Sequence, residues 1–318
     1  VRSHQGTPEI NPSKHYLYIH GDVEKPWKFS VSDLMRMPME SRQIFLECGG
    51  NSNSSWADNP VQKTVGTIHG LISTAEWTGV SVKYLFQSLG IDPKAKWAIA
   101  TGSDAGAFNM SIPLSKLMDD CLIALYQNGE RLRPENGYPL RLVVPGIQGV
   151  SWVKWLRRLE VGDMPYASKD EAVHYIDLLP SGLHRQYTTI QECKSVITTP
   201  SGGQQLLDKG FYNITGLAWS GRGKIKHVDI SVDGGNNWKR ARLETPVLSK
   251  AVTRFNMDWT WDGSPAILMS RATDETGYVQ PMIKQLREVR GTRSIYHNNS
   301  IQAWKLDVNG ELSNVQVG

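Results

Sequence analysis

Hydrophobic and polar positions alternate over the last part of the chain. Residues 210–221 and 224–243 both show this pattern, which strands adopt when one face is buried and the other meets water. In the second stretch the apolar positions are Ile225, Val228, Ile230 and Val232. The Asp233-Gly234-Gly235 segment that follows is typical of a turn. Short strands separated by Gly, Asn and Asp turns predict an immunoglobulin-like β-sandwich over residues 195–318.

The pattern before residue 195 mixes helical and strand-like segments. Residues 82–89 carry apolar side chains at helical spacing, and Gly90 is suited to end that helix. Asn128-Gly129 lies between two runs and predicts a tight hairpin. These signals indicate that helices and strands share one domain.

Two segments in this half contain charged residues within apolar surroundings. Residues 140–144 alternate as a strand does, with Arg141 on the face opposite Leu140 and Leu142. Residues 151–161 fit a helix or a strand equally well. We therefore predict an α+β protein, with a mixed domain at residues 1–194 followed by the sandwich at 195–318.

The composition is that of an ordinary globular protein of two-domain size. The chain has 318 residues, 40% hydrophobic and 21% charged, and it lacks a run of about 18 apolar residues that would predict membrane insertion. A formal net charge of +4 allows docking to an acidic partner. It does not resemble a nucleic-acid-binding surface, so we expect no nucleic acid among the partners.

Three widely spaced cysteines limit the thiol chemistry. Cys48, Cys121 and Cys193 form no C-x-x-C pair, which argues against a paired-cysteine zinc site and a dithiol redox motif. Residues 45–56, FLECGGNSNSSW, deliver Cys48 into a Gly-rich turn where another group can approach the backbone closely. Its thiolate could be a nucleophile, a metal ligand or only a structural side chain.

The turn at Cys48 resembles the Cys-x-Gly-Asn signature of the sulfite oxidase family. Further segments resemble that family in the same order along the chain: residues 2–8 with Arg2-Ser3-His4 and Pro8, residues 69–86 (HGLISTAEWTGVSVKYLF), residues 135–161 (ENGYPLRLVVPGIQGVSWVKWLRRLEV) and residues 216–238 (GLAWSGRGKIKHVDISVDGGNNW). The resemblance thus extends over most of the sequence.

The resemblance implies a molybdenum cofactor. One molybdenum would be held by a single pyranopterin dithiolene, the molybdopterin form without a nucleotide, with Cys48 as the protein ligand to the metal; a soft thiolate suits such a site. By matching position, the residues implied to bind the cofactor are His4, Cys48, Asn51, Asn136, Arg141, Ser151, Val153 and Lys154. Arg141 would offer a planar fork to the phosphate and Lys154 a point charge. The alternative for Arg141 is an ordinary salt bridge.

The resemblance also implies catalytic residues. Arg2 matches an arginine that binds the substrate anion. Tyr175 matches the position of a tyrosine near the metal, with Tyr166 as its rival, and either could instead be a packing aromatic. Arg290 or Arg293 matches a late arginine of the anion site.

One departure from the family bears on the substrate. Typical sulfite oxidases carry arginines directly after the signature, whereas this chain has Ser52 and Asn53. Loss of a cation should weaken the binding of a free dianion such as sulfite. The segments ECGGNS, SGRGK and QECKSVITTPSGG are more similar to the sulfane dehydrogenase branch of the bacterial Sox system, which oxidises a sulfur atom carried on a partner protein's cysteine. A sulfite dehydrogenase acting on free sulfite is the alternative.

Partners and location follow from the same resemblance. The sequence has no C-x-x-C-H haem site and no cysteine set for an iron–sulfur cluster, so we expect electrons to pass to a c-type cytochrome subunit or a soluble cytochrome c. The family implies a homodimer or heterotetramer. It also implies the bacterial periplasm, reached in folded form with a twin-arginine signal.

Two other function classes stay open on the residues alone. The chain could be a non-catalytic binding module that retains the fold, although the combination of Cys48, Arg2, Arg141 and Lys154 argues against this reading. It could also be a metal-free cysteine-dependent hydrolase or transferase, which would need a histidine beside Cys48. The candidates for that base are His4, His69, His174 and His184.

Overall fold

The computed structural model describes residue 3, residues 5–186 and residues 190–317. The chain forms two compact units, each assembled from two separate segments. The mixed unit contains Val1–Gln43 and Ala75–Tyr175, and the sandwich unit contains Ile44–Thr74 and Ile176–Gly318. The predicted boundary after residue 194 stays a prediction, since compact units need not coincide with consecutive domains.

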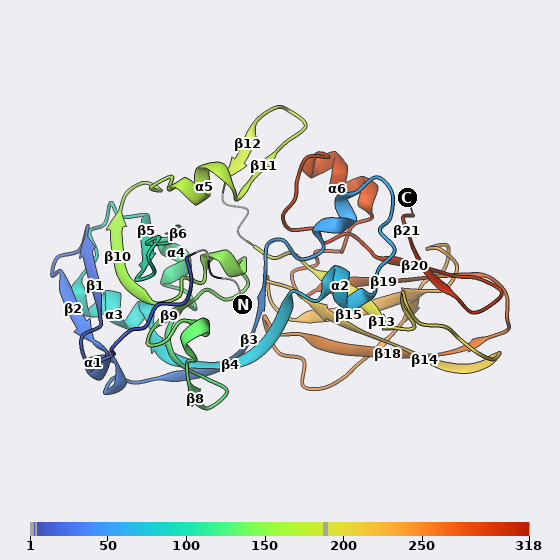
Figure 1. The fold of residues 1–318 in the computed structure, drawn as a ribbon, viewed down its shortest axis with the longest axis horizontal. Coiled ribbons are helices and arrows are strands. Elements are labelled where there is room, and N and C mark those ends of the chain that lie inside the picture. Colours follow the sequence, from blue (N-terminus) through green and yellow to red (C-terminus); the bar gives the residue numbers. More distant parts are fainter. Residues whose placement is uncertain (1–2, 4, 187–189, 318) are drawn as a thin grey trace. The chain divides into compact units, whose positions relative to one another are not determined.

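The mixed unit contains a five-stranded sheet in the order β2-β1-β10-β5-β6 (Figure 1). Its strands are β1 (Tyr16–Gly21), β2 (Trp27–Ser30), β5 (Trp97–Gly102), β6 (Asn109–Pro113) and β10 (Leu156–Gly162). Strands β1 and β10 are parallel and the other pairs are antiparallel. The ambiguous segment 151–161 is therefore mostly a strand, preceded by the short helix η3 (Gly149–Ser151).

A second sheet has the order β3-β4-β7-β8, and β9 also pairs with β7. Its strands are β3 (Glu40–Glu47), β4 (Ile72–Ser81), β7 (Leu122–Gln127), β8 (Glu130–Arg131) and β9 (Arg141–Val143). The predicted hairpin is confirmed between β7 and β8. Asn128 has a φ of 53° and Gly129 a φ of 78°, the paired positive values that this tight turn requires.

The helices of the mixed unit are short, and the predicted one is confirmed. Besides η3, they are α1 (Val31–Met35), α3 (Val82–Leu89), α4 (Leu114–Leu117), α5 (Lys169–Val173) and η2 (Pro134–Asn136). Helix α3 buries Val82, Leu85, Phe86 and Leu89, which its spacing places on one side. Gly90 ends it with a φ of 70°.

Two antiparallel sheets form the sandwich that the alternation predicts. One has the order β13-β14-β18-β17 and the other β16-β15-β19-β20-β21. The strands are β13 (Lys194–Thr199), β14 (Gly210–Trp219), β15 (Ile225–Ser231), β16 (Lys239–Arg240), β17 (Arg242–Leu243), β18 (Thr253–Trp261), β19 (Ala266–Asp274), β20 (Ala303–Leu306) and β21 (Leu312–Val315). Ile214 and Phe255 of the first sheet share one buried core with Val228 and Leu268 of the second. The α+β class is thus confirmed.

The sandwich unit also carries elements outside the two sheets. These are η1 (Asn53–Trp56), α2 (Val65–His69), the hairpin of β11 (Ile176–Leu178) and β12 (His184–Gln186), and α6 (Ile283–Arg290). Strand β3 ends in this unit and β4 begins in it, so the connection that carries Cys48 belongs to the sandwich unit. Among the described residues, no helix is both long and apolar enough to cross a membrane.

Candidate functional site: a thiol loop and a buried arginine

Residues 48–52, hereafter the thiol loop, follow β3 directly. Cys48 is exposed and free, whereas Cys121 and Cys193 are buried. Burial raises the pKa of Cys193, which makes that thiol inert. The Cys48 amide donates to the Leu71 carbonyl at 3.0 Å. The loop thus presents one accessible thiol from a backbone that hydrogen bonds hold in place.

Asn51 ties the thiol loop together from inside. Its backbone N–H donates to the Cys48 carbonyl at 2.9 Å, and its side-chain Oδ1 accepts from the Leu71 backbone N–H at 3.0 Å. Its Nδ2 donates to Glu47 Oε1 at 2.9 Å. Asn51 is 1% exposed, and its side chain is hydrogen-bonded to Glu47 and Leu71. Its predicted contact with the cofactor stays a prediction.

Two buried charged residues next to the thiol loop were not predicted from the sequence. Glu47 is 3% exposed and Lys194 is 1% exposed, and Lys194 Nζ lies 3.8 Å from Glu47 Oε1. Burial lowers the pKa of Lys194 to about 8, and the charge of Glu47 opposes this shift. The only sequence signal for Lys194 is a lysine placed at the start of an apolar strand.

The three candidate bases that the structure describes, His69, His174 and His184, do not favour the metal-free hydrolase. His69 is buried, with Nδ1 2.6 Å from Ser52 Oγ and Nε2 3.0 Å from Gln302 Oε1, so both ring nitrogens have partners. Burial, assisted by the charge of Lys194, lowers its pKa to about 3. His174 faces Asp170 at 3.0 Å, and His184 lies exposed in β12.

Arg141 is a buried cation in the mixed unit, on β9. Its guanidinium carbon lies 5.2 Å from the Trp77 ring centre and 5.9 Å from that of Trp152. Nη1 donates to the Asn136 carbonyl at 3.0 Å, whereas the buried Nε has no hydrogen-bond partner among the described residues. Burial lowers the pKa of Arg141 to about 10. A buried guanidinium with an unsatisfied donor fits an anionic ligand.

Lys154 adds a second cation beside Arg141. Burial, followed by the charge of Arg141, lowers its pKa to about 8. Lys154 Nζ donates to the Glu135 carbonyl at 3.0 Å and lies 4.3 Å from the Trp155 ring centre. Two neighbouring cations whose charged forms are disfavoured match the phosphate of molybdopterin, because an anion would relieve their repulsion.

The other predicted cofactor residues of the mixed unit surround these cations in sequence and structure. Asn136 Nδ2 donates to Gln127 Oε1 at 3.0 Å, and the Val153 carbonyl accepts from the Leu142 amide at 2.9 Å. Ser151 is buried at the end of η3. The structure thus groups Asn136, Arg141, Ser151, Val153 and Lys154 on neighbouring segments of one unit, and places Cys48 and Asn51 in the other.

Arg290 lies in a buried ion-pair cluster of the sandwich unit. Its Nη1 is 3.0 Å from Asp177 Oδ2 and its Nη2 is 3.6 Å from Glu192 Oε2. The Arg290 and Asp177 side chains are 3% and 1% exposed. A substrate anion at Arg290 would have to compete with two carboxylates. The proposed role in substrate binding remains a prediction, and the geometry favours a structural role.

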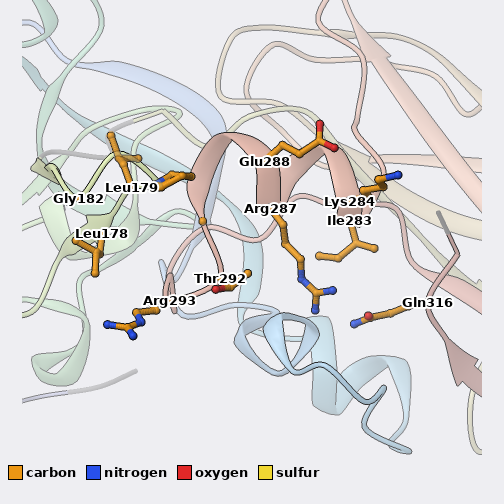
Figure 2. A pocket seen from close by; sticks show the side chains of 12 residues that line it. Leu178, Leu179, Gly182, Ile283, Lys284, Arg287, Glu288, Thr292, Arg293 and Gln316 are labelled. Carbon is orange, nitrogen blue, oxygen red and sulfur yellow. The ribbon is translucent and has the colours of Figure 1, made fainter.

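Arg293, the alternative to Arg290, is exposed and lines an open pocket of about 770 Å³ (Figure 2). The pocket lies within the sandwich unit, between α6 and the segment after β11. Arg287, which also lines it, donates to the carbonyls of Trp56 and Ala57 at 3.2 and 3.1 Å. The pocket therefore has a basic wall that includes a partly buried arginine held by backbone oxygens.

The remaining predicted catalytic residues are placed less distinctly. Tyr175 is half-buried at the end of the mixed unit, and its amide donates to the Asp170 carbonyl at 3.1 Å. Tyr166 is 39% exposed. Neither arrangement decides between them. Arg2 and His4 lie outside the described residues, so their predicted roles stay predictions.

Comparison with known proteins assigns both parts of the chain. Residues 4–169 match the oxidoreductase molybdopterin binding domain, and residues 185–304 match the Mo-co oxidoreductase dimerisation domain. The second match supports oligomeric assembly. The solved structure of the sulfane dehydrogenase SoxCD from Paracoccus pantotrophus is 44% identical, with a TM-score of 0.94 over 98% of this chain and 80% of that chain.

Curated relatives are more distant and longer. The mitochondrial sulfite oxidase of Drosophila melanogaster is 31% identical over 77% of this chain and 46% of its own length. An NADH nitrate reductase of Solanum lycopersicum is 29% identical over 88% of this chain and 35% of its own length. The chain thus spans a third to a half of these relatives. Because the molybdopterin-binding match covers more than half of its residues, the chain belongs to the sulfite oxidase family of oxidoreductases that bind molybdenum through molybdopterin.

Proposed function

We propose that the chain is the catalytic subunit of a molybdenum-dependent sulfane dehydrogenase, which oxidises a sulfur atom carried on a cysteine of a partner protein. The observation that carries this proposal is the 44% identity to the sulfane dehydrogenase SoxCD over 98% of the chain. The identity to a sulfite oxidase is 31% over a smaller share of it.

Each group of site residues has a definite role in this proposal. The exposed Cys48 thiolate would bind the metal, since the loop leaves it accessible and the other cysteines are buried. Arg141 and Lys154 would hold the phosphate of molybdopterin through charge-assisted hydrogen bonds. When bound, the cofactor supplies a metal centre that takes two electrons from the sulfur atom. His4, Asn136, Ser151 and Val153 would line the pterin.

The residues after Cys48 favour a carrier-bound substrate over free sulfite. Ser52 is 1% exposed and its hydroxyl is taken by buried partners, and Asn53 is uncharged. Neither position offers a cation to a small dianion. Oxidation of free sulfite is the second candidate, supported by the similarity to sulfite oxidases. In both cases Arg2 would bind the anion, with Tyr175 beside it and, of the two late arginines, Arg293, or Arg290 only if its two carboxylates release it.

The proposal extends to partners and location. Electrons would leave through a c-type cytochrome, either as a permanent subunit or as a soluble protein, and the dimerisation domain would join two copies of the chain. The sulfur-carrier protein would be a further, transient partner. We place the enzyme in the bacterial periplasm, exported in folded form.

The test compares substrates on protein matured with an intact molybdopterin pathway. Wild type and Cys48→Ser are analysed for molybdenum, and each is supplied with cytochrome c and either free sulfite or a thiosulfonate-loaded carrier protein. We expect about one metal per chain in wild type, turnover on the carrier and no turnover by the variant. Efficient sulfite oxidation with none on the carrier would select the second candidate. A protein without molybdenum would refute both.

A further inference from the structure

The two ends of the thiol loop meet at one buried ammonium group. Lys194 Nζ donates to Ser52 Oγ at the end of the loop and to the Asn298 carbonyl at 2.6 Å. It lies 3.8 Å from Glu47 Oε1, immediately before Cys48. Glu47 in turn accepts from Trp219 Nε1 at 2.8 Å. One side chain from β13 is therefore bound to both flanks of Cys48.

The hydrogen-bond chain from Ser52 through His69 and Gln302 to Asn314 has a fixed order of donors and acceptors. Asn314 Nδ2 donates to the Val61 carbonyl at 2.9 Å, so Asn314 Oδ1 is the atom that accepts from Gln302 Nε2 at 2.7 Å. Gln302 Oε1 must then accept from His69 Nε2. Burial and the charge of Lys194 lower the pKa of His69 to about 3, so the ring is neutral near pH 7 and its Nδ1 accepts the Ser52 hydroxyl proton. Ser52 Oγ is left as the acceptor that an ammonium requires.

The charges explain why a lysine occupies this place. Glu47 accepts the hydrogen bond from Asn51 Nδ2 and so holds the turn of the loop, but its carboxylate is only 3% exposed and costs free energy there unless a cation compensates it. The ammonium of Lys194 offsets that charge. A backbone hydrogen bond also holds the thiol loop, since the His297 N–H donates to the Gly49 carbonyl at 2.7 Å.

We propose that Lys194 is the positioning residue of Cys48: its buried ammonium locks the thiol loop at Glu47 and Ser52 and so fixes where the thiol points. The lock lies wholly within the sandwich unit, and all of its groups belong to this chain. The role as a lock of the loop is independent of the proposed substrate. Its consequence for the metal rests on Cys48 being the metal ligand.

The primary test measures the loop in metal-free protein. In Lys194→Met, hydrogen exchange of the amides of residues 48–52 should accelerate by about tenfold or more, since a hydrogen bond from a charged donor is lost. Because Met leaves Glu47 buried without its counter-charge, the double variant Glu47→Gln/Lys194→Met is made alongside it. Lys226→Met, exposed on β15, is the matched control and should exchange as wild type does.

A second readout distinguishes positioning from mere stability. The double variant, loaded with cofactor, should give an electron paramagnetic resonance spectrum of molybdenum that differs from wild type, while Lys226→Met should not. Fast exchange of residues 48–52 in the double variant together with a changed spectrum would support the proposal. Exchange and spectrum like those of wild type would overturn it, whatever the thermal stability of the single variant. Neither readout requires the enzyme to turn over any substrate.

Discussion

Replacing Arg290 with methionine tests whether this arginine is structural or substrate-binding. The variant removes the guanidinium from Asp177, 1% exposed, and from Glu192, 20% exposed. Asp177 keeps the Ser294 hydroxyl at 2.5 Å but loses the buried positive charge. Breaking a buried pair by removing one partner costs about 3–5 kcal/mol, because the other charge stays in a poorly solvated place.

The expected shift in unfolding temperature follows from that free energy. For a unit of roughly 150–250 residues, 1 kcal/mol shifts the midpoint by about 2–4 °C. The Arg290→Met variant should therefore unfold roughly 6–20 °C below wild type. The measurement is thermal unfolding followed by circular dichroism near pH 7, on metal-free protein so that cofactor binding does not contribute.

Two further variants make the result decisive. Asp177→Asn/Arg290→Met removes both charges of the closer pair and should recover most of the loss. Arg293→Met, exposed on the same segment, should stay within about 0.5 kcal/mol of wild type. A midpoint for Arg290→Met within about 2 °C of wild type would refute the reasoning. So small a shift would mean that the ion pairs of Arg290 contribute little to stability and that its guanidinium is available to an anion.

Three other predictions concern single sites. Arg141→Met should lower the molybdenum content at least about tenfold, yet cost metal-free protein no more than about 1 kcal/mol, since the guanidinium has no carboxylate partner among the described residues; metal analysis and thermal unfolding check both parts. The pKa of His69 is about 3 in the folded protein, below its ordinary value of 6.5. The contribution of the neutral ring to the free energy of unfolding is therefore fully present above pH 6.5 and falls by at most about 1.4 kcal/mol per pH unit towards pH 3. In acid unfolding followed by fluorescence, His69→Gln should make the free energy of unfolding depend less steeply on pH. Gly129→Ala should cost about 1–2 kcal/mol in urea unfolding, because its φ of 78° is unfavourable for alanine although no atom lies within 4 Å of the added Cβ.

Local pattern predicted those elements in which neighbours in the sequence are also neighbours in space. Helix α3 and its end at Gly90 need only helical spacing and a residue tolerant of positive φ. The Asn128-Gly129 hairpin needs only a turn of the correct hand. The strands of the sandwich follow from alternation, and the odd three-residue step from Ile225 to Val228 corresponds to a register shift in the pairing of β15 with β19.

The features that could not be predicted depend on pairing across long distances. Nothing in residues 44–74 indicates that they belong with strands beginning at residue 194, since the contacts that decide it, such as that of Lys194 with Ser52, join positions 142 apart. Strand β9 buries Arg141, Leu142 and Val143 alike, so the face predicted to carry Arg141 is as buried as the opposite one. Alternation fails there because both faces are covered.

Three buried cations within the described residues differ in what surrounds them, and that difference bears on the role of each. Arg290 has two carboxylates within 4 Å, and Lys194 has one carboxylate and two hydrogen-bonding oxygens. Arg141 has two indole rings, one carbonyl and an unsatisfied Nε within the described part of the chain. A buried charge costs free energy unless it is compensated, and the protein itself supplies that compensation to Arg290 and Lys194. Under the proposed function, the anion that compensates Arg141 is the phosphate of the cofactor, and the unsatisfied Nε is the observation that supports this role.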